Sequence, residues 1–137
     1  LLLQEVASPY TLEAVSIATK QCFVRSFKEQ LPIFFQSGAI VPLSRIREGR
    51  YTEASFAFLP IEKSSAPGVV KLPAGRCAVT HHTGDYLSIG KAYERLLEYC
   101  RGHQLKIVSD AYEFAINDYL STGNESEYIT KIMFYVE

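Results

Sequence analysis

The chain has few of the residues on which several classes of protein depend. It has no tryptophan and one methionine, and its three cysteines, Cys22, Cys77 and Cys100, are scattered. An odd number of widely spaced cysteines does not form a disulfide framework, and it indicates reduced thiols in a cytoplasmic protein. No apolar run reaches the length of a membrane-spanning helix. We therefore expect a cytoplasmic protein without a membrane partner.

Net charge is nearly absent as well. Fourteen basic residues against fifteen acidic ones leave a net charge of −1, whereas nucleic-acid binding relies on an excess of Lys and Arg. The one basic cluster, Arg45, Arg47 and Arg50, surrounds a glycine, and we interpret it as a solvated turn rather than a phosphate site. These residues predict no direct contact with DNA.

Motifs for catalysis and metal binding are also missing. The sequence has no Gly-rich phosphate loop, no nucleophile elbow and no Cys-x-x-Cys pair. His81 and His82 are neighbours on an expected strand, so their side chains point to opposite faces and cannot share one ion. Cys100 and His103 have helical spacing, but two ligands do not make a zinc site. We expect no metal, no cofactor and no catalytic residue.

What is present describes an ordinary globular chain. Its 137 residues are 47% apolar and 21% charged, which suits a single domain with a core that needs no metal or disulfide. Because the sequence lacks an initiator methionine, we expect it to be one domain of a longer protein.

The order of expected elements occurs twice. In the first half we expect a strand over 11–20, a helix over 23–35 that Pro32 bends or ends, and extended segments over 39–46 and 51–59. In the second half we expect a strand over 77–82, a helix over 86–102 with Asp85 as its capping residue, and strands over 107–116 and 128–136. Between them, residues 60–68 are rich in Pro, Ser and Gly, as is typical of a linker.

This repetition predicts an α+β fold made of two β-α-β-β modules, residues 1–60 and 69–137, joined by a linker over 61–68. The modules form one antiparallel sheet with pseudo-twofold symmetry, and both helices cover one face of it. The other face is then solvated, closed by loops or left as a groove. A groove between the halves is the natural place for a ligand.

Glu113 is the main candidate for a binding residue. It lies in the middle of an apolar strand, where alternation places it on one face with Ala111 and Ala115. Two interpretations are open: a solvated glutamate on an exposed sheet face, which is the common case, or a buried carboxylate that awaits a cation, because an unpaired buried charge is costly.

The aromatic residues give a second lead, since nine Tyr and eight Phe are present. Tyr51, Tyr86 and Tyr128 fall at the ends of expected elements, where the rim of a pocket is plausible. A tyrosine offers an aromatic face and a hydroxyl, and both suit a bulky organic cation. We assign Tyr93 and Tyr112 instead to packing between helix and sheet.

Two segments resemble a known family. Residues 72–79, LPAGRCAV, are similar to the strand entry of GyrI-like, or bacterial transcription activator, effector-binding domains. Residues 104–113, QLKIVSDAYE, resemble the drug-binding domain of multidrug-responsive activators of the MerR family. The doubled strand–helix–hairpin plan is that family's fold as well. The spacing from the first motif to Glu113 and onward to Tyr128 also agrees.

The resemblance implies a function. In that family a buried glutamate neutralises lipophilic cations and a tyrosine of the last strand walls the pocket; Glu113 and Tyr128 match these positions. The segment after the first motif has fewer aromatic residues than the family, with Cys77, His82 and Gly84 there and Tyr86 nearby, which implies a different pocket shape. His82 adds a polar, pH-sensitive contact.

We therefore expect a non-enzymatic effector-binding domain of a transcriptional regulator, sensing a hydrophobic, cationic small molecule. Its contact with DNA is expected only through a module absent from these residues, and the full-length protein is expected to be a homodimer. Two alternatives remain at this stage. One is a stand-alone GyrI-type module that inhibits a partner such as DNA gyrase; the other is a small hydrolase with Glu113 as general base.

Overall fold

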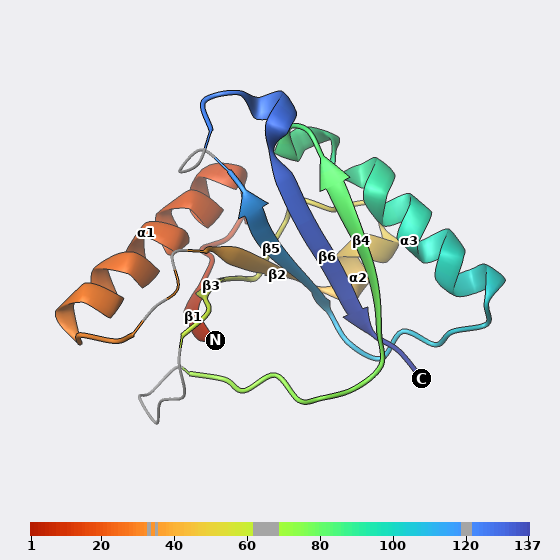
Figure 1. Cartoon of the computed structure of the whole chain (residues 1–137), viewed down its shortest axis with the longest axis horizontal. Coiled ribbons are helices and arrows are strands. Elements are labelled where there is room, and N and C mark those ends of the chain that lie inside the picture. Colours follow the sequence, from red (N-terminus) through yellow and green to blue (C-terminus); the bar gives the residue numbers. More distant parts are fainter. Residues whose placement is uncertain (33, 35, 62–68, 119–121) are drawn as a thin grey trace.

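One antiparallel sheet organises the chain, with its strands in the order β1-β3-β2-β5-β6-β4 (Figure 1). The structure is a computed structural model that describes all residues except 33, 35, 62–68 and 119–121. The strands are β1 (Leu2–Glu5), β2 (Gly38–Val41), β3 (Phe56–Leu59), β4 (Cys77–Thr83), β5 (Ala111–Asn117) and β6 (Ile129–Tyr135). The helices are α1 (Leu12–Lys28), α2 (Leu43–Arg47) and α3 (Gly90–Gly102), with short 3-10 turns η1 (Tyr86–Ser88) and η2 (Glu125–Glu127).

The strand order confirms the predicted duplication. The order β1-α1-β2-β3 is repeated as β4-α3-β5-β6, with α2 added between β2 and β3. The two modules meet where β2 pairs with β5, and each then extends outwards to its own edge strand, β1 or β4. α1 contacts β1 and β3 while α3 contacts β4, so each helix covers its own module. The expected linker over 61–68 lies almost entirely outside the described residues.

The prediction of a strand over 11–20 is wrong, because this segment begins α1. Thr11 caps the helix, its hydroxyl oxygen accepting a hydrogen bond of 3.1 Å from the backbone N–H of Ala14. The buried positions Ala18, Cys22 and Ser26 recur every four residues but are small. Bulky apolar residues mark a helical stripe more clearly, so the sequence showed partial alternation instead. The strand of this module is β1, which was not predicted.

Several element boundaries also differ from the predictions. The helix expected over 23–35 is the second half of α1 and ends at Lys28, before Pro32. The segment expected to be extended over 39–46 contains β2 and then α2, which starts after Pro42 because proline suits the beginning of a helix. Of the segment 51–59 only β3 is a strand, and β5 starts at Ala111 rather than at 107.

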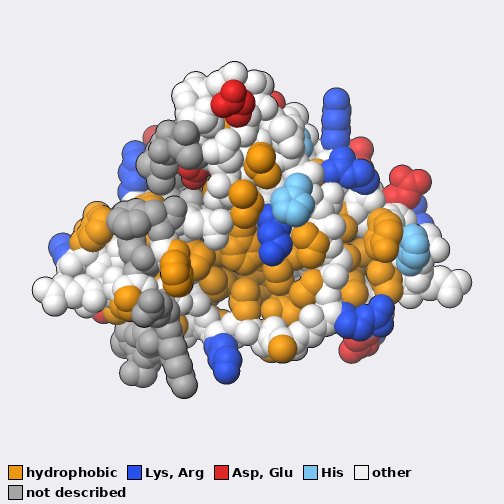
Figure 2. All heavy atoms as spheres, in the orientation of Figure 1, with side chains coloured by type: hydrophobic (Ala, Val, Ile, Leu, Met, Phe, Trp, Pro, Cys, Tyr) orange, Lys and Arg blue, Asp and Glu red, His pale blue; other side chains and the backbone are white. Residues whose placement is uncertain are grey.

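The two faces of the sheet differ. On the helix side, Tyr93 and Leu96 of α3 pack on Ile132 and Phe134 of β6 and form the main core. None of the described helices covers the other side, and Figure 2 shows hydrophobic side chains gathered over its centre. Tyr112 lies there against Tyr135, with ring centroids 6.1 Å apart. The prediction that Tyr112 packs between helix and sheet is therefore wrong, since it occupies the face opposite Glu113.

Gly38 permits the close approach of strands at the junction of the modules. A Cβ atom there would overlap the ring of Phe58, which is fully buried, and the backbone oxygen of Glu113. We expect Gly38→Ala to lower the free energy of unfolding by about 2 kcal/mol, since neither neighbour can move freely. Urea denaturation at pH 7 measures this change. The matched control is Gly102→Ala, where a Cβ meets open space; equal stability of the two variants would contradict the close-packing argument.

Candidate functional site

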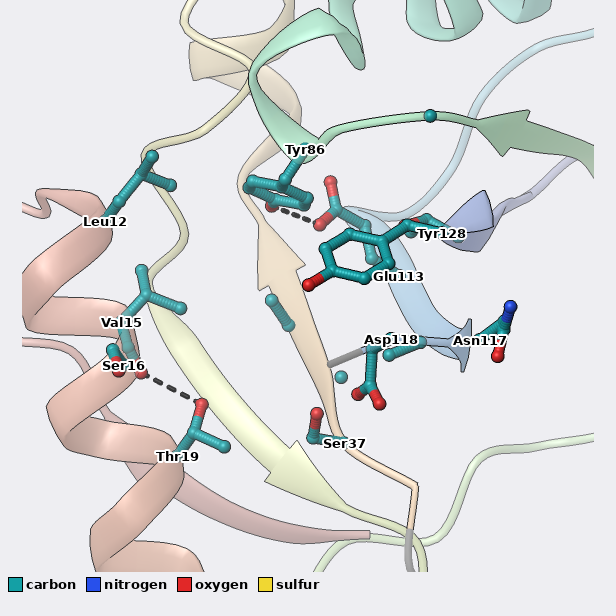
Figure 3. Close-up of a pocket in the computed structure, with 15 residues that line it drawn as sticks. Leu12, Val15, Ser16, Thr19, Ser37, Tyr86, Glu113, Asn117, Asp118 and Tyr128 are labelled. Atoms are coloured by element: carbon teal, nitrogen blue, oxygen red, sulfur yellow. Dashed lines mark hydrogen bonds between the residues drawn. The ribbon is translucent and has the colours of Figure 1, made fainter. Parts of the chain in front are cut away.

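A cavity of about 240 Å³ lies on the helix side of the sheet, between α1 and the start of the second module. Figure 3 shows its lining side chains converging from α1, from the β2–β5 junction and from the turn around Tyr86. The lining residues are Leu12, Val15, Ser16, Thr19, Ser37, Gly38, Ala39, Gly84, Tyr86, Glu113, Ala115, Asn117, Asp118, Tyr128 and Thr130. The cavity thus spans both modules. It is slightly smaller than typical sites for drug-sized ligands, which begin near ~300 Å³.

Glu113 lies on β5 at the floor of this cavity. Its side chain projects to the helix side, as the strand alternation predicted, and it is 2% exposed. Ala39 is its direct partner on β2, so only a methyl group stands beside the carboxylate across the junction. The interpretation of Glu113 as a solvated surface residue is therefore wrong.

Two tyrosines donate hydrogen bonds to this carboxylate. The hydroxyl of Tyr86 donates to Oε1 and the hydroxyl of Tyr93 donates to Oε2. Tyr86 comes from η1 and Tyr93 from the first turn of α3, so the short stretch 86–93 holds both oxygens. Each oxygen of Glu113 therefore has one neutral donor.

Within the described part of the chain, the carboxylate of Glu113 has hydrogen bonds but no counter-ion. Among the described residues, no Lys or Arg forms an ion pair with Glu113. Burial raises the pKa of Glu113 from 4.5 to about 7, and the hydrogen bonds from Tyr86 and Tyr93 oppose part of this rise. Burial, followed by the charge of Glu113, likewise raises the pKa of both tyrosines, so their hydroxyls remain donors.

Tyr93 is one of the site residues that sequence reasoning missed. It does pack between helix and sheet, as predicted, and it is fully buried. A buried tyrosine hydroxyl requires a partner, however, and Glu113 on the facing strand supplies it. The seven-residue spacing from Tyr86 was the available signal, since it places both rings on one side of the helical segment.

Two of the predicted site residues do not line the cavity. Tyr51 stacks on Tyr93 with ring centroids 5.2 Å apart. It therefore supports the ring whose hydroxyl donates a hydrogen bond to Glu113. His82 is buried, and its Nε2 lies 2.9 Å from the backbone oxygen of Asp85 and 3.0 Å from Oγ of Ser88. His82 thereby stabilises the turn that carries Tyr86. Asp85 precedes η1, but its side chain makes no capping hydrogen bond to that turn.

Tyr128 does line the cavity. It precedes β6, and its ring lies beside Glu113 with the hydroxyl directed into the cavity (Figure 3). The wall opposite comes from α1 and includes Leu12 and Val15. The α1 residues were not foreseen because this segment was expected to be a strand. The cavity thus combines one buried acid with aromatic and aliphatic walls.

Within the described ranges, no group of three or more His, Cys, Asp or Glu side chains could hold a metal ion. None of the described helices is both long enough and apolar enough to cross a bilayer.

Comparison with known proteins gives a family and a fold. The family model for the GyrI-like small molecule binding domain matches residues 44–137. The crystal structure of the EcmrR C-terminal domain is similar, with a TM-score of 0.67 at 16% identity, covering 98% of this chain and 86% of that one. In the cryo-EM structure of an EcmrR–DNA complex, the TM-score is 0.55 at 13% identity, covering 91% of this chain and 67% of the longer one. A search of curated protein sequences returned no match.

Proposed function

This chain belongs to the GyrI-like small molecule binding domain family, and from that premise we propose that it is the effector-binding domain of a transcriptional regulator. Its ligand is a hydrophobic cation that enters the cavity and becomes the counter-ion of Glu113. The domain binds without catalysis in the cytoplasm. DNA is contacted by another module, as the longer chain of the EcmrR–DNA complex suggests, and the full-length regulator is a homodimer.

The observation that carries this proposal is a buried carboxylate that pairs with no Lys or Arg among the residues the structure describes. A carboxylate at 2% exposure loses most of its hydration. The hydrogen bonds from Tyr86 and Tyr93 offset only part of that loss, and a positive charge beside the carboxylate would offset more of it. The cavity directly above Glu113 is where such a charge fits, because the described residues supply none.

The hydrogen bonds to Glu113 also favour one kind of cation. Since Tyr86 and Tyr93 already donate to its two oxygens, about half of the acceptor positions of the carboxylate are taken. A primary ammonium carries three N–H donors and would lose part of its hydration at this depth without replacement. A quaternary cation needs no hydrogen-bond acceptor, and it interacts well with the faces of aromatic rings. We therefore infer that the charge beside Glu113 is quaternary or delocalised.

Ligand binding in this cavity couples the two modules. The walls come from α1 of the first module and from Tyr86, Glu113 and Tyr128 of the second. A ligand that contacts both has a different affinity for arrangements in which the modules are closer or further apart, and it shifts their populations accordingly. This gives the regulator a physical means of transmitting occupancy to its DNA-binding part.

A ligand pair that differs only in charge tests the proposal. Hexyltrimethylammonium should bind the domain saturably at pH 8 in isothermal titration calorimetry. Hexyldimethylamine N-oxide has the same shape, with an oxygen in place of one methyl group, but no net charge. We expect it to bind at least about tenfold more weakly, because it cannot neutralise Glu113. Equal affinity, or no binding of the ammonium compound, would rule out a cation sensor.

A further inference from the structure

The cavity contains a second carboxylate at its other end. Asp118 lines it together with Glu113, and Figure 3 shows the two acids at different places along the same space, with Glu113 beneath Tyr86 and Asp118 beside Ser37. Between them the floor is small and mostly apolar, with Ala39 and Ala115. The two acids therefore face one ligand volume, not two separate sites.

A β-bulge brings Asp118 to this face. Five residues separate Glu113 from Asp118, so regular alternation would turn Asp118 to the opposite side of the sheet. In β5, however, Ala115 pairs with Thr130 of β6 while Asn117 already pairs with Ile129, which leaves Ile116 as an extra residue. An extra residue reverses the alternation beyond it, and bulges commonly redirect side chains beside functional sites.

The neighbouring side chains agree with this reversal. Ile116, the inserted residue, is 47% exposed. Asn117 lies at the margin of the cavity in Figure 3, and its amide is turned to the backbone oxygen of Glu127, to which it donates a hydrogen bond of 2.7 Å. The carboxylate of Asp118 points into the cavity in the same view. The bulge therefore exchanges the orientations that these two residues would otherwise have.

The surroundings of the two acids differ in polarity. Glu113 is enclosed by tyrosine rings and is almost fully buried, whereas Asp118 is only half-buried and has the hydroxyl of Ser37 beside it. A cation beside the half-buried Asp118 keeps part of its hydration shell. The two ends thus suit different cations, one without N–H donors beside Glu113 and one that remains partly hydrated beside Asp118.

We propose that the ligand is an elongated dication, with a quaternary or delocalised charge beside Glu113 and a protonated amine beside Asp118. This inference rests on the proposed function, since it uses Glu113 as the first charge site. It adds that Asp118 determines specificity and that the ligand has a narrow linker. The two charges of the ligand are then separated by roughly 10–15 Å, the distance between Glu113 and Asp118 along a strand at ~3.3 Å per residue, shortened by the bulge. The modest volume of 240 Å³ also favours a slim ligand.

The test compares octyltrimethylammonium with 8-aminooctyltrimethylammonium, which carries a terminal amine protonated at pH 7. For the wild-type domain we expect the dication to bind about five- to tenfold more tightly in calorimetry at 150 mM salt, as suits a partly exposed ion pair. In Asp118→Asn this advantage should vanish, while the affinity for octyltrimethylammonium stays within about twofold. In Glu98→Gln, which removes an exposed negative charge from α3, the advantage should persist.

Spacer length provides a readout that does not depend on a variant. The advantage of the ω-amino compound over its alkyl counterpart should peak at one chain length in a series from four to twelve carbons. If the alkyl monocation does not bind, the proposed function fails. If the monocation binds but the dication gains nothing at any length, or gains equally in Asp118→Asn, only the role of Asp118 is overturned.

Discussion

Glu113→Gln is expected to bind hexyltrimethylammonium about 100-fold more weakly than the wild type at pH 8, a loss of about 2.7 kcal/mol. The reason is that a buried amide presents only a dipole to the cation, whereas the carboxylate presents a full charge in a site with little water. The wild type should itself lose about tenfold in affinity for each pH unit below 7, because protonation neutralises Glu113, whose pKa burial raises to about 7. The variant should show no such dependence.

The loss of affinity in Glu113→Gln and the pH dependence of the wild type test the same role of the Glu113 charge. Hexyltrimethylammonium has no proton to lose, so any pH dependence belongs to the protein. Calorimetric titrations from pH 5 to 8 should give wild-type affinities that approach the affinity of the variant at the acidic end. Glu98→Gln serves as the control and should follow the wild type. A variant that binds as tightly as the wild type at pH 8 would remove Glu113 from the centre of the site.

The same substitution should make the ligand-free domain more stable at alkaline pH. The pKa of Glu113 is about 7 in the folded chain against an ordinary value of 4.5, chiefly because of burial. A raised pKa means that the folded state binds an extra proton between these values. The stability associated with that proton is complete below pH 4.5 and is lost as the pH rises through 7, by about 3 kcal/mol. Glutamine has no charge to bury and avoids this loss.

Urea denaturation at pH 5 and pH 8 measures the difference. At pH 8, Glu113→Gln should exceed the wild type in free energy of unfolding by up to about 3 kcal/mol, and near pH 5 the two should converge. Glutamine can still accept from one tyrosine and donate to the other hydroxyl oxygen, so the hydrogen bonds are retained. Glu98→Gln should change neither value by more than about 0.5 kcal/mol. A destabilised Glu113→Gln at pH 8 would show that the charge is compensated within the protein.

The second module was more predictable from sequence than the first. Its helix carries large residues such as Tyr93 and Leu96 at helical spacing, and β5 alternates clearly around Glu113. Both patterns arise because bulky apolar side chains must face the core. In the first module α1 buries small residues, Ala18, Cys22 and Ser26, which leave only a weak periodic signal. The same physical rule holds there, but the residues that express it are not conspicuous.

The candidate site could be predicted only in part, for a related reason. Alternation is sufficient to place Glu113 on one face, and the ends of elements suggested Tyr86 and Tyr128. The hydrogen bond from Tyr93 depends on how α3 crosses the sheet, and the orientation of Asp118 depends on a single inserted residue. Such tertiary details are not set by local periodicity. Tyr51 was suggested by its place at the end of an expected element, and His82 by its place in the segment after the first family motif. Packing puts both of them outside the lining of the cavity.

The pairing of Ala39 with Glu113 has a consequence for the number of ligands that one domain binds and for the symmetry between its modules. A duplicated architecture might have offered two equivalent receptors, one in each half. Here the residue that faces Glu113 across the junction is Ala39, whose side chain is only a methyl group. The first module therefore leaves room for a ligand, and the second module supplies the charged side chain. The backbones of the two modules are related by symmetry, but their side chains at the junction have different roles. We therefore expect each domain to bind one ligand, with the charge of the ligand towards the second module.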